Sequence, residues 1–132
     1  MSNLDGQIDK MSTMAYSLAW YQPDVVLHLT LDGHPTVAEL QDIDQEVTAV
    51  LNGSRMKMRL LIDAANLKEG YQTANHLRDT QKYMNHPRLE RILVVSDNKL
   101  NRLVTLLAFC VAHARFVQFE NLQKAEDYLK LL

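Results

Sequence analysis

The residues of this chain with the clearest potential for chemistry are its single cysteine and the histidine that follows it closely. Cys110 and His113 would lie one turn apart on a helix, and a thiolate next to a histidine can act as a nucleophile. A reactive cysteine also needs a cationic and partly exposed setting, whereas Cys110 stands between Phe109 and Val111. We therefore expect Cys110 to be a small buried hydrophobic residue.

The histidines do not form a metal-binding pattern. No HExxH or His-x-His pair is present, and no cysteine or carboxylate accompanies a histidine at ligand spacing. We expect structural or surface roles for all of them and no metal or other cofactor; the five are His28, His34, His76, His86 and His113.

A third candidate is the segment Ser96-Asp97-Asn98-Lys99, which contains the S-x-x-K and S-D-N patterns of β-lactamases. In those enzymes the two patterns are separate and a K-T-G follows, which this chain lacks. The segment joins an apolar run to a helical pattern, so we expect Ser96 or Asp97 to cap the helix. With no catalytic set left, the sequence predicts a protein that is not an enzyme.

The composition is that of an ordinary globular domain with one sizeable core. Of 132 residues, 47% are hydrophobic and 23% are charged, and the net charge of −2 gives no basic surface for nucleic acid or an anionic membrane. The first twelve residues lack the apolar centre of a signal peptide, and the longest apolar run, Leu103–Ala112, is too short to span a bilayer. We expect a cytoplasmic protein without a transmembrane segment.

The chain is organised around the stretch Met58–Thr73. Its apolar run ends in Asp63, a turn of small residues follows, and a helical pattern begins at Gly70–Tyr71. A buried parallel strand passes into a helix in this way, and the carboxyl ends of such strands often carry ligand or partner sites. Asp63 could bind there, but a role in the turn is the simpler interpretation.

The other elements follow from hydrophobic spacing and capping signals. Two alternating strands flank a turn at Pro23, and Thr36 with Glu39 forms a capping box. The helix expected over residues 98–113 is apolar nearly all round, so we expect it to be buried on its sheet face and covered on part of the other. The resulting order is β-β-α-β-α-β-α-β-α, an α/β fold with a mixed, mainly parallel sheet of five strands and four helices. The expected strands are residues 14–21, 25–31, 59–63, 89–96 and 115–119, and the expected helices are 37–51, 71–85, 98–113 and 122–132.

This element order and three segments resemble the SpoIIAA-like group of the STAS (sulfate transporter and anti-sigma factor antagonist) superfamily. The segments are LLID at 60–63, RILVVSD at 91–97 and VQFENLQKAEDYL at 117–129. The resemblance implies a single SpoIIAA-like domain over residues 13–132, after a lead-in of residues 1–12. It also implies a regulatory or protein-interaction module.

STAS anti-sigma antagonists carry a phosphorylated serine just after the third strand, in a D-S-S-G-like setting. Here Glu69-Gly70-Tyr71-Gln72 stands at that place, so we expect the usual phosphoserine to be absent. Thr73 is the only nearby serine or threonine, so it is the alternative candidate for phosphorylation. Glu69 could supply a permanent negative charge, or it could simply be an acid at a helix start.

Two sites follow from these interpretations. The first is a surface for a protein partner after the third strand, formed by Asp63, Asn66, Lys68, Glu69, Tyr71 and Thr73. The alternative is a pocket beside the sheet for an apolar small molecule or lipid, since the same fold class includes lipid-binding relatives of the CRAL-TRIO type. That pocket would be lined by Tyr71, Leu77, Leu103, Leu106, Leu107 and Phe109.

The first strand is rich in large side chains, which fit either the core or a surface for a second copy of the chain. Aromatic residues and methionine are enriched at interfaces, and an edge strand invites pairing. A homodimer is therefore a further expectation, resting on Tyr16, Trp20 and Tyr21 with Met11 and Met14.

Overall fold

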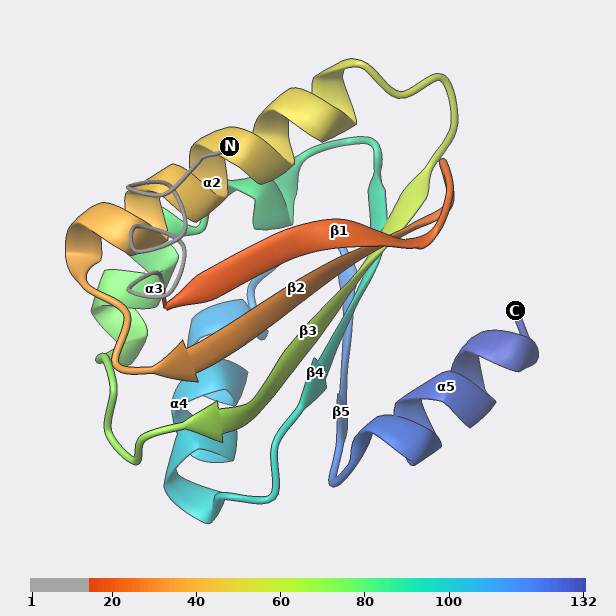
Figure 1. The fold of residues 1–132 in the computed structure, drawn as a ribbon. Helices are drawn as coiled ribbons and strands as arrows, with labels where there is room; N and C mark the ends of the chain where they lie inside the picture. The colour runs from red at the N-terminus through yellow and green to blue at the C-terminus, as the bar shows by residue number, and fades with distance from the viewer. Residues whose placement is uncertain (1–14) are drawn as a thin grey trace, which may run out of the picture.

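In the computed structural model, which describes residues 15–132, a five-stranded sheet carries helices on both faces (Figure 1). The strands lie in sequence order across the sheet; β1 is antiparallel to β2, and all other neighbours are parallel. This confirms the predicted fold class and element order, while the lead-in of residues 1–12 lies outside the described part. The strands are β1 (Tyr16–Gln22), β2 (Val26–Gly33), β3 (Met58–Leu67), β4 (Leu89–Val95) and β5 (Arg115–Phe119), and the helices are α2 (Val37–Asn52), α3 (Ala74–Thr80), the 3₁₀ helix η1 (Lys82–Asn85), α4 (Lys99–Phe109) and α5 (Leu122–Lys130).

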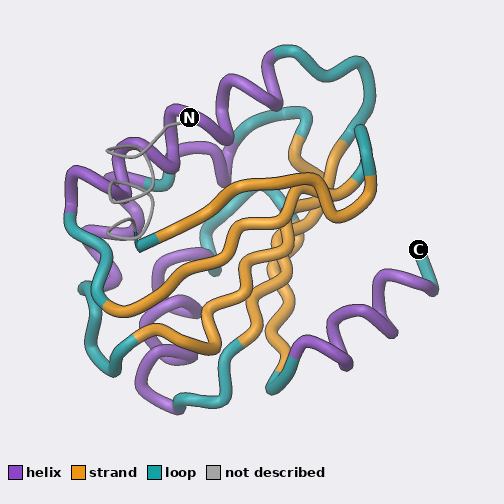
Figure 2. The backbone as a smooth tube through the Cα atoms, viewed as in Figure 1, coloured by secondary structure: helices purple, strands orange, loops and turns teal. Residues whose placement is uncertain are grey.

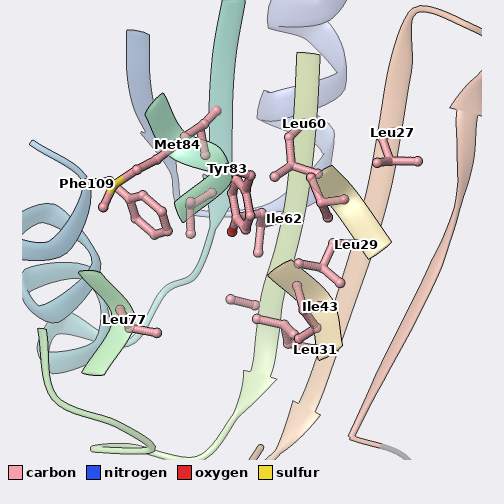
Figure 3. Packing of buried hydrophobic residues seen from close by; sticks show 14 of the residues in the cluster. Leu27, Leu29, Leu31, Ile43, Leu60, Ile62, Leu77, Tyr83, Met84 and Phe109 are labelled. Atoms are coloured by element: carbon pink, nitrogen blue, oxygen red, sulfur yellow. The ribbon is translucent and has the colours of Figure 1, made fainter. Parts of the chain in front are cut away.

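The helices divide unequally between the two faces of the sheet. Helices α2, α3 and α4 cover one face, and α5 lies alone on the other, as the purple segments of Figure 2 show. The larger apolar cluster fills the space under the three helices, where Leu29, Ile43 and Ile62 meet Tyr83 and Phe109 (Figure 3). The smaller cluster lies beneath Ala125 of α5 and includes Val26, Leu61, Leu93 and Val95. Strand β4 contributes to both clusters, as its continuous apolar run predicts.

Helix α2 begins at the predicted capping box. The Thr36 hydroxyl accepts the Glu39 amide proton at 3.1 Å, and the Glu39 carboxylate accepts the Thr36 amide proton at 3.0 Å. The second carboxylate oxygen accepts the amide proton of Ala15 at 3.0 Å, which ties the start of β1 to this helix. The hydrogen bond from the Thr36 amide, helped by that from Ala15, holds the pKa of Glu39 below its ordinary value despite partial burial. The helix ends at Asn52, one residue beyond the predicted end, and Gly53 is its C-cap.

The region after β3 differs from the prediction in two ways. Strand β3 continues to Leu67 instead of ending at Asp63, because β2 goes on pairing with it through Asn66 and Leu67. The next helix begins at Ala74 instead of Tyr71, because Thr73 has an extended backbone (φ −86°, ψ 159°) and caps the helix with its side chain.

Helix α4 also differs from the prediction. Its N-cap is Asn98, whose side chain accepts the Asn101 amide proton at 2.9 Å, and not Ser96 or Asp97. The helix is buried on its sheet face as predicted, through Asn101, Thr105, Ala108 and Phe109, but the expectation that part of its other face is also covered is wrong, because the leucines there are exposed.

Candidate functional site

The candidate site is the loop between β3 and α3, residues 68–73, which we call the β3–α3 loop. It lies at the carboxyl edge of the parallel strands, and Asn101 of α4 holds it from beneath. The Asn101 side chain donates to the Lys68 carbonyl at 3.2 Å and accepts the Gly70 amide proton at 3.0 Å. Asn101 itself is 1% exposed, and its two part-buried bonds anchor the loop backbone at Lys68 and Gly70.

Two further contacts fix the first residues of the loop. The Lys68 amide donates to the Gly33 carbonyl at the end of β2, at 2.8 Å. The Asn98 side chain donates to the Glu69 carboxylate at 3.0 Å. The side chains of Lys68 and Glu69 are exposed, so the loop presents two neighbouring and opposite charges on a fixed backbone.

Asp63 lies within β3, so the turn that the sequence predicts after it is absent, although its side chain does bind the backbone. Its carboxylate accepts the Ala65 amide proton at 3.2 Å, and the residue is half-buried within β3. It lies on the sheet face opposite Ile62 and Ala64, since neighbouring side chains of a strand alternate. Asn66 follows on the same strand and is exposed.

Tyr71 and Thr73 have structural roles in the loop. Tyr71 is 3% exposed, and burial raises the pKa of its hydroxyl, so its placement on a partner surface is wrong. Thr73 is the N-cap of α3, where its hydroxyl accepts the His76 amide proton at 3.1 Å. The exposed members of the predicted partner site are therefore Asn66, Lys68, Glu69 and Thr73.

The structure brings together three of the six residues of the predicted apolar pocket and separates the other three from them. Tyr71, Leu77 and Phe109 line a cavity of about 20 Å³ beneath the helices, which has room for a single water molecule. Leu103, Leu106 and Leu107 lie on the outer side of α4 and are exposed. The prediction was wrong because α4 turns Asn101, Thr105, Ala108 and Phe109 toward the sheet, and not these leucines.

A larger hollow of about 550 Å³ lies at the opposite edge of the sheet. It is formed between the β1–β2 hairpin and the end of α2 and was not predicted, because its lining residues are distant in sequence. The lining includes Trp20 and Met56, whose exposure is visible only in the structure; the full lining is Trp20, Asp24, Ala49, Val50, Gly53, Ser54, Arg55, Met56 and Met58.

The remaining chemical candidates are Cys110 and the histidines. Cys110 is exposed, so the expectation that it is buried is wrong; it caps the carboxyl end of α4, outside the packed face. Within residues 15–132, no group of three or more histidine, cysteine or acidic side chains could hold a metal ion.

The aromatic residues of β1 divide between core and surface. Tyr16 is buried and donates its hydroxyl proton to Glu46 of α2. Trp20 and Tyr21 are exposed, although the Tyr21 hydroxyl donates to Glu126 of α5 at 2.9 Å. Dimerisation through this strand stays a prediction.

Comparison with known proteins gives the class of the molecule. The SpoIIAA-like family model matches residues 26–130, and the chain belongs to that family. A similar solved structure is that of an uncharacterized protein from the DUF3478 family with a SpoIIAA-like fold, from Shewanella loihica PV-4. The two chains are 20% identical with a TM-score of 0.61, and the match covers 87% of this chain and 92% of the other. No curated protein matches the sequence.

Family and fold together support a regulatory or interaction role at the level of the family. In residues 15–132, no helix is long and apolar enough to cross a membrane.

Proposed function

We propose that this protein is a non-enzymatic regulatory module that binds a partner protein through the β3–α3 loop. Lys68 and Glu69 would make the central contacts, with Asn66 and Thr73 at the border. The observation that carries the proposal is the fixed backbone beneath these exposed side chains. A loop that is already ordered loses little conformational entropy on binding, so more of the contact energy contributes to affinity.

The loop chemistry also bears on regulation. Residues 63–73 contain no serine, so we propose that binding does not depend on the phosphoserine of STAS antagonists. The Glu69 carboxylate accepts a hydrogen bond from Asn98. A partner could bind this negative charge without any phosphorylation of the loop.

The alternative, a carrier of an apolar small molecule or lipid, is not supported by any observation in the core. The cavity of about 20 Å³ would have to grow many times before it could hold such a ligand.

The proposal is tested by reversing the charge of Glu69. The tagged protein is purified gently from its own cells, and the chains that accompany it are identified by mass spectrometry. We expect a protein partner that is retained by the wild type and lost with Glu69→Lys. The melting temperature should change little, because the contact between Glu69 and Asn98 is exposed.

Asp42→Lys is the matched control. Asp42 is an exposed acid on α2, so this variant makes the same change in net charge away from the loop. It should keep the partner. A partner retained by Glu69→Lys, or lost equally with both variants, would contradict the proposed site.

A further inference from the structure

The parallel strands bring three arginines into one row near their amino ends. Arg59 of β3 is the register partner of Arg91 of β4, and Arg91 is in turn the partner of Arg115 of β5. Each precedes, by an even number of positions, a residue that belongs to or packs against the smaller apolar cluster. All three therefore lie on the sheet face that α5 covers, on strands about 4.8 Å apart. We call these three residues the arginine row.

The row concentrates positive charge where water screens it only in part. The side chains of Arg59 and Arg91 are 23% and 21% exposed, while Arg115 is exposed. Like charges on neighbouring strands repel, and partial burial strengthens that repulsion. An anion beside the row would remove this cost.

Glu90 supplies only part of the negative charge that the row needs. Its carboxylate accepts a hydrogen bond from Arg59 Nε at 3.1 Å but lies 3.7 Å from Arg91 Nε, beyond hydrogen-bond distance. That Arg91 Nε is shielded from solvent and donates no hydrogen bond within residues 15–132. Over the same described part of the chain, Arg115 makes no ion pair. Three guanidinium groups and one carboxylate leave a surplus of two positive charges.

The segments around the row do not cancel this surplus. Residues 22–25, 53–59, 85–91 and 110–115, which lead into the parallel strands, contain six lysines and arginines and two acids, Asp24 and Glu90. The acids of α5 have other partners: Glu126 accepts the Tyr21 hydroxyl proton at 2.9 Å, and Asp127 lies 3.9 Å from Lys130. This edge of the sheet is therefore basic, although the whole chain has a net charge of −2.

We propose that the arginine row binds the phosphate monoester group of a ligand. Guanidinium groups donate paired hydrogen bonds to phosphate oxygens, which a lysine cannot do. A monoester carries nearly two negative charges at neutral pH, as the surplus requires, whereas a carboxylate or a phosphodiester brings one. The Tyr128 hydroxyl accepts from Arg91 Nη1 at 2.6 Å, so its own proton is free for a further phosphate oxygen.

The arginine row is separate from the β3–α3 loop. The row lies near the amino ends of the parallel strands, and the loop follows the carboxyl end of β3. A phosphorylated ligand and a partner protein can therefore bind at the same time, and each site can fail without the other.

The test measures how the full chain binds probes that differ in their anionic group. The first two are monoesters: glycerol 3-phosphate, and a nine-residue peptide with one phosphoserine. The third is the same peptide with glutamate in place of the phosphoserine. Binding is measured by isothermal titration calorimetry at low salt. We expect the phosphoserine peptide to bind at least about tenfold more tightly than the glutamate peptide. The monoester that binds more tightly shows whether the source is a small molecule or a phosphoprotein.

Variants connect this binding to the row. Arg115→Gln should weaken monoester binding at least about fivefold, and Arg91→Lys should weaken it although the charge is kept. Lys99→Gln is the matched control, since it removes one exposed positive charge on α4 and should leave binding unchanged. Far-ultraviolet circular dichroism checks that each variant is folded. Glu69→Lys should also leave monoester binding unchanged, which separates this site from the loop.

Four results would overturn the inference. They are no binding of either monoester at millimolar concentration, equal affinity for the phosphoserine and glutamate peptides, equal effects of Arg115→Gln and Lys99→Gln, and tighter binding of a ten-nucleotide RNA, whose phosphates are diesters.

Discussion

Asn101 is the residue on which the exposed loop most depends. Its buried side chain satisfies a carbonyl and an amide of the β3–α3 loop, and its own amide is capped by Asn98. Gly70 completes this arrangement, because its φ of 68° is accessible to glycine at low energy. Together they hold the backbone that carries Lys68 and Glu69 through hydrogen bonds to Asn101.

Removing the Asn101 side chain should release the loop. Asn101→Ala leaves the Lys68 carbonyl and the Gly70 amide without their partners, so we expect the free energy of unfolding to fall by about 1–3 kcal/mol. Hydrogen exchange at the Gly70 amide should become much faster. Urea unfolding and exchange measured by NMR check both effects.

Asn66→Ala is the control for that experiment, since Asn66 is exposed at the end of β3. It should change stability by less than about 0.5 kcal/mol. Unchanged protection of Gly70 in Asn101→Ala would show that the loop is held by other means.

At this scale the sequence predicts local contacts well and distant ones poorly. The box of Thr36 and Glu39 was predictable because its partners are three residues apart. Asn101 was not, because an asparagine between Leu100 and Arg102 shows no partner in the sequence, and the residues that it binds are 31 and 33 positions away.

At the scale of elements, α2 and α4 illustrate opposite outcomes. The apolar residues of α2 lie on one side, so spacing predicts its buried face, and Leu40, Ile43 and Val47 are indeed buried. The apolar residues of α4 surround the helix, so spacing cannot select a face. Its orientation depends on Gln118, which approaches from β5 and could be recognised only in the folded structure.

The cap of α2 provides a pH-dependent test. The pKa of Glu39 is lowered in the folded state, so its contribution to stability is present above the unfolded pKa of about 4.3 and is lost as the pH falls through the lower folded value. Glu39→Ala should therefore reduce stability by about 1 kcal/mol at pH 6, and the difference from wild type should shrink toward pH 3. Chemical unfolding at several pH values measures it; a constant difference would contradict the assignment.

At the scale of the whole molecule, the order of the elements along the chain and the parallel direction of most strands follow from the sequence. Residues 92–95 form a continuous apolar run that only a strand buried on both faces accommodates, and the helices between strands require parallel crossovers. The position of the site was less predictable. Because β3 extends four residues beyond Asp63, the exposed charges of Lys68 and Glu69 lie farther along the chain than the apolar run before Asp63 indicates.

The molecule presents its fixed, charged loop and its exposed leucines close together on α4 and its neighbours. Asn98 and Asn101 contact the loop from the same helix whose outer side carries the leucines. Helix α5 covers the other face of the sheet (Figure 1). The hollow near Trp20 is lined by the β1–β2 hairpin and residues 49–58, and by no residue of α4 or the β3–α3 loop. The arginine row lies near the amino ends of the parallel strands, so the two proposed sites are at opposite ends of the sheet.

The most direct test of this account is photo-crosslinking in the protein's own cells. A photoreactive amino acid replaces Lys68 in one variant and Asp42 in another, and crosslinked products are identified by mass spectrometry after irradiation. We predict a specific crosslink to a protein chain from position 68 and none from position 42. The absence of a crosslink at position 68, or the same products from both positions, would contradict the claim that the β3–α3 loop binds a partner.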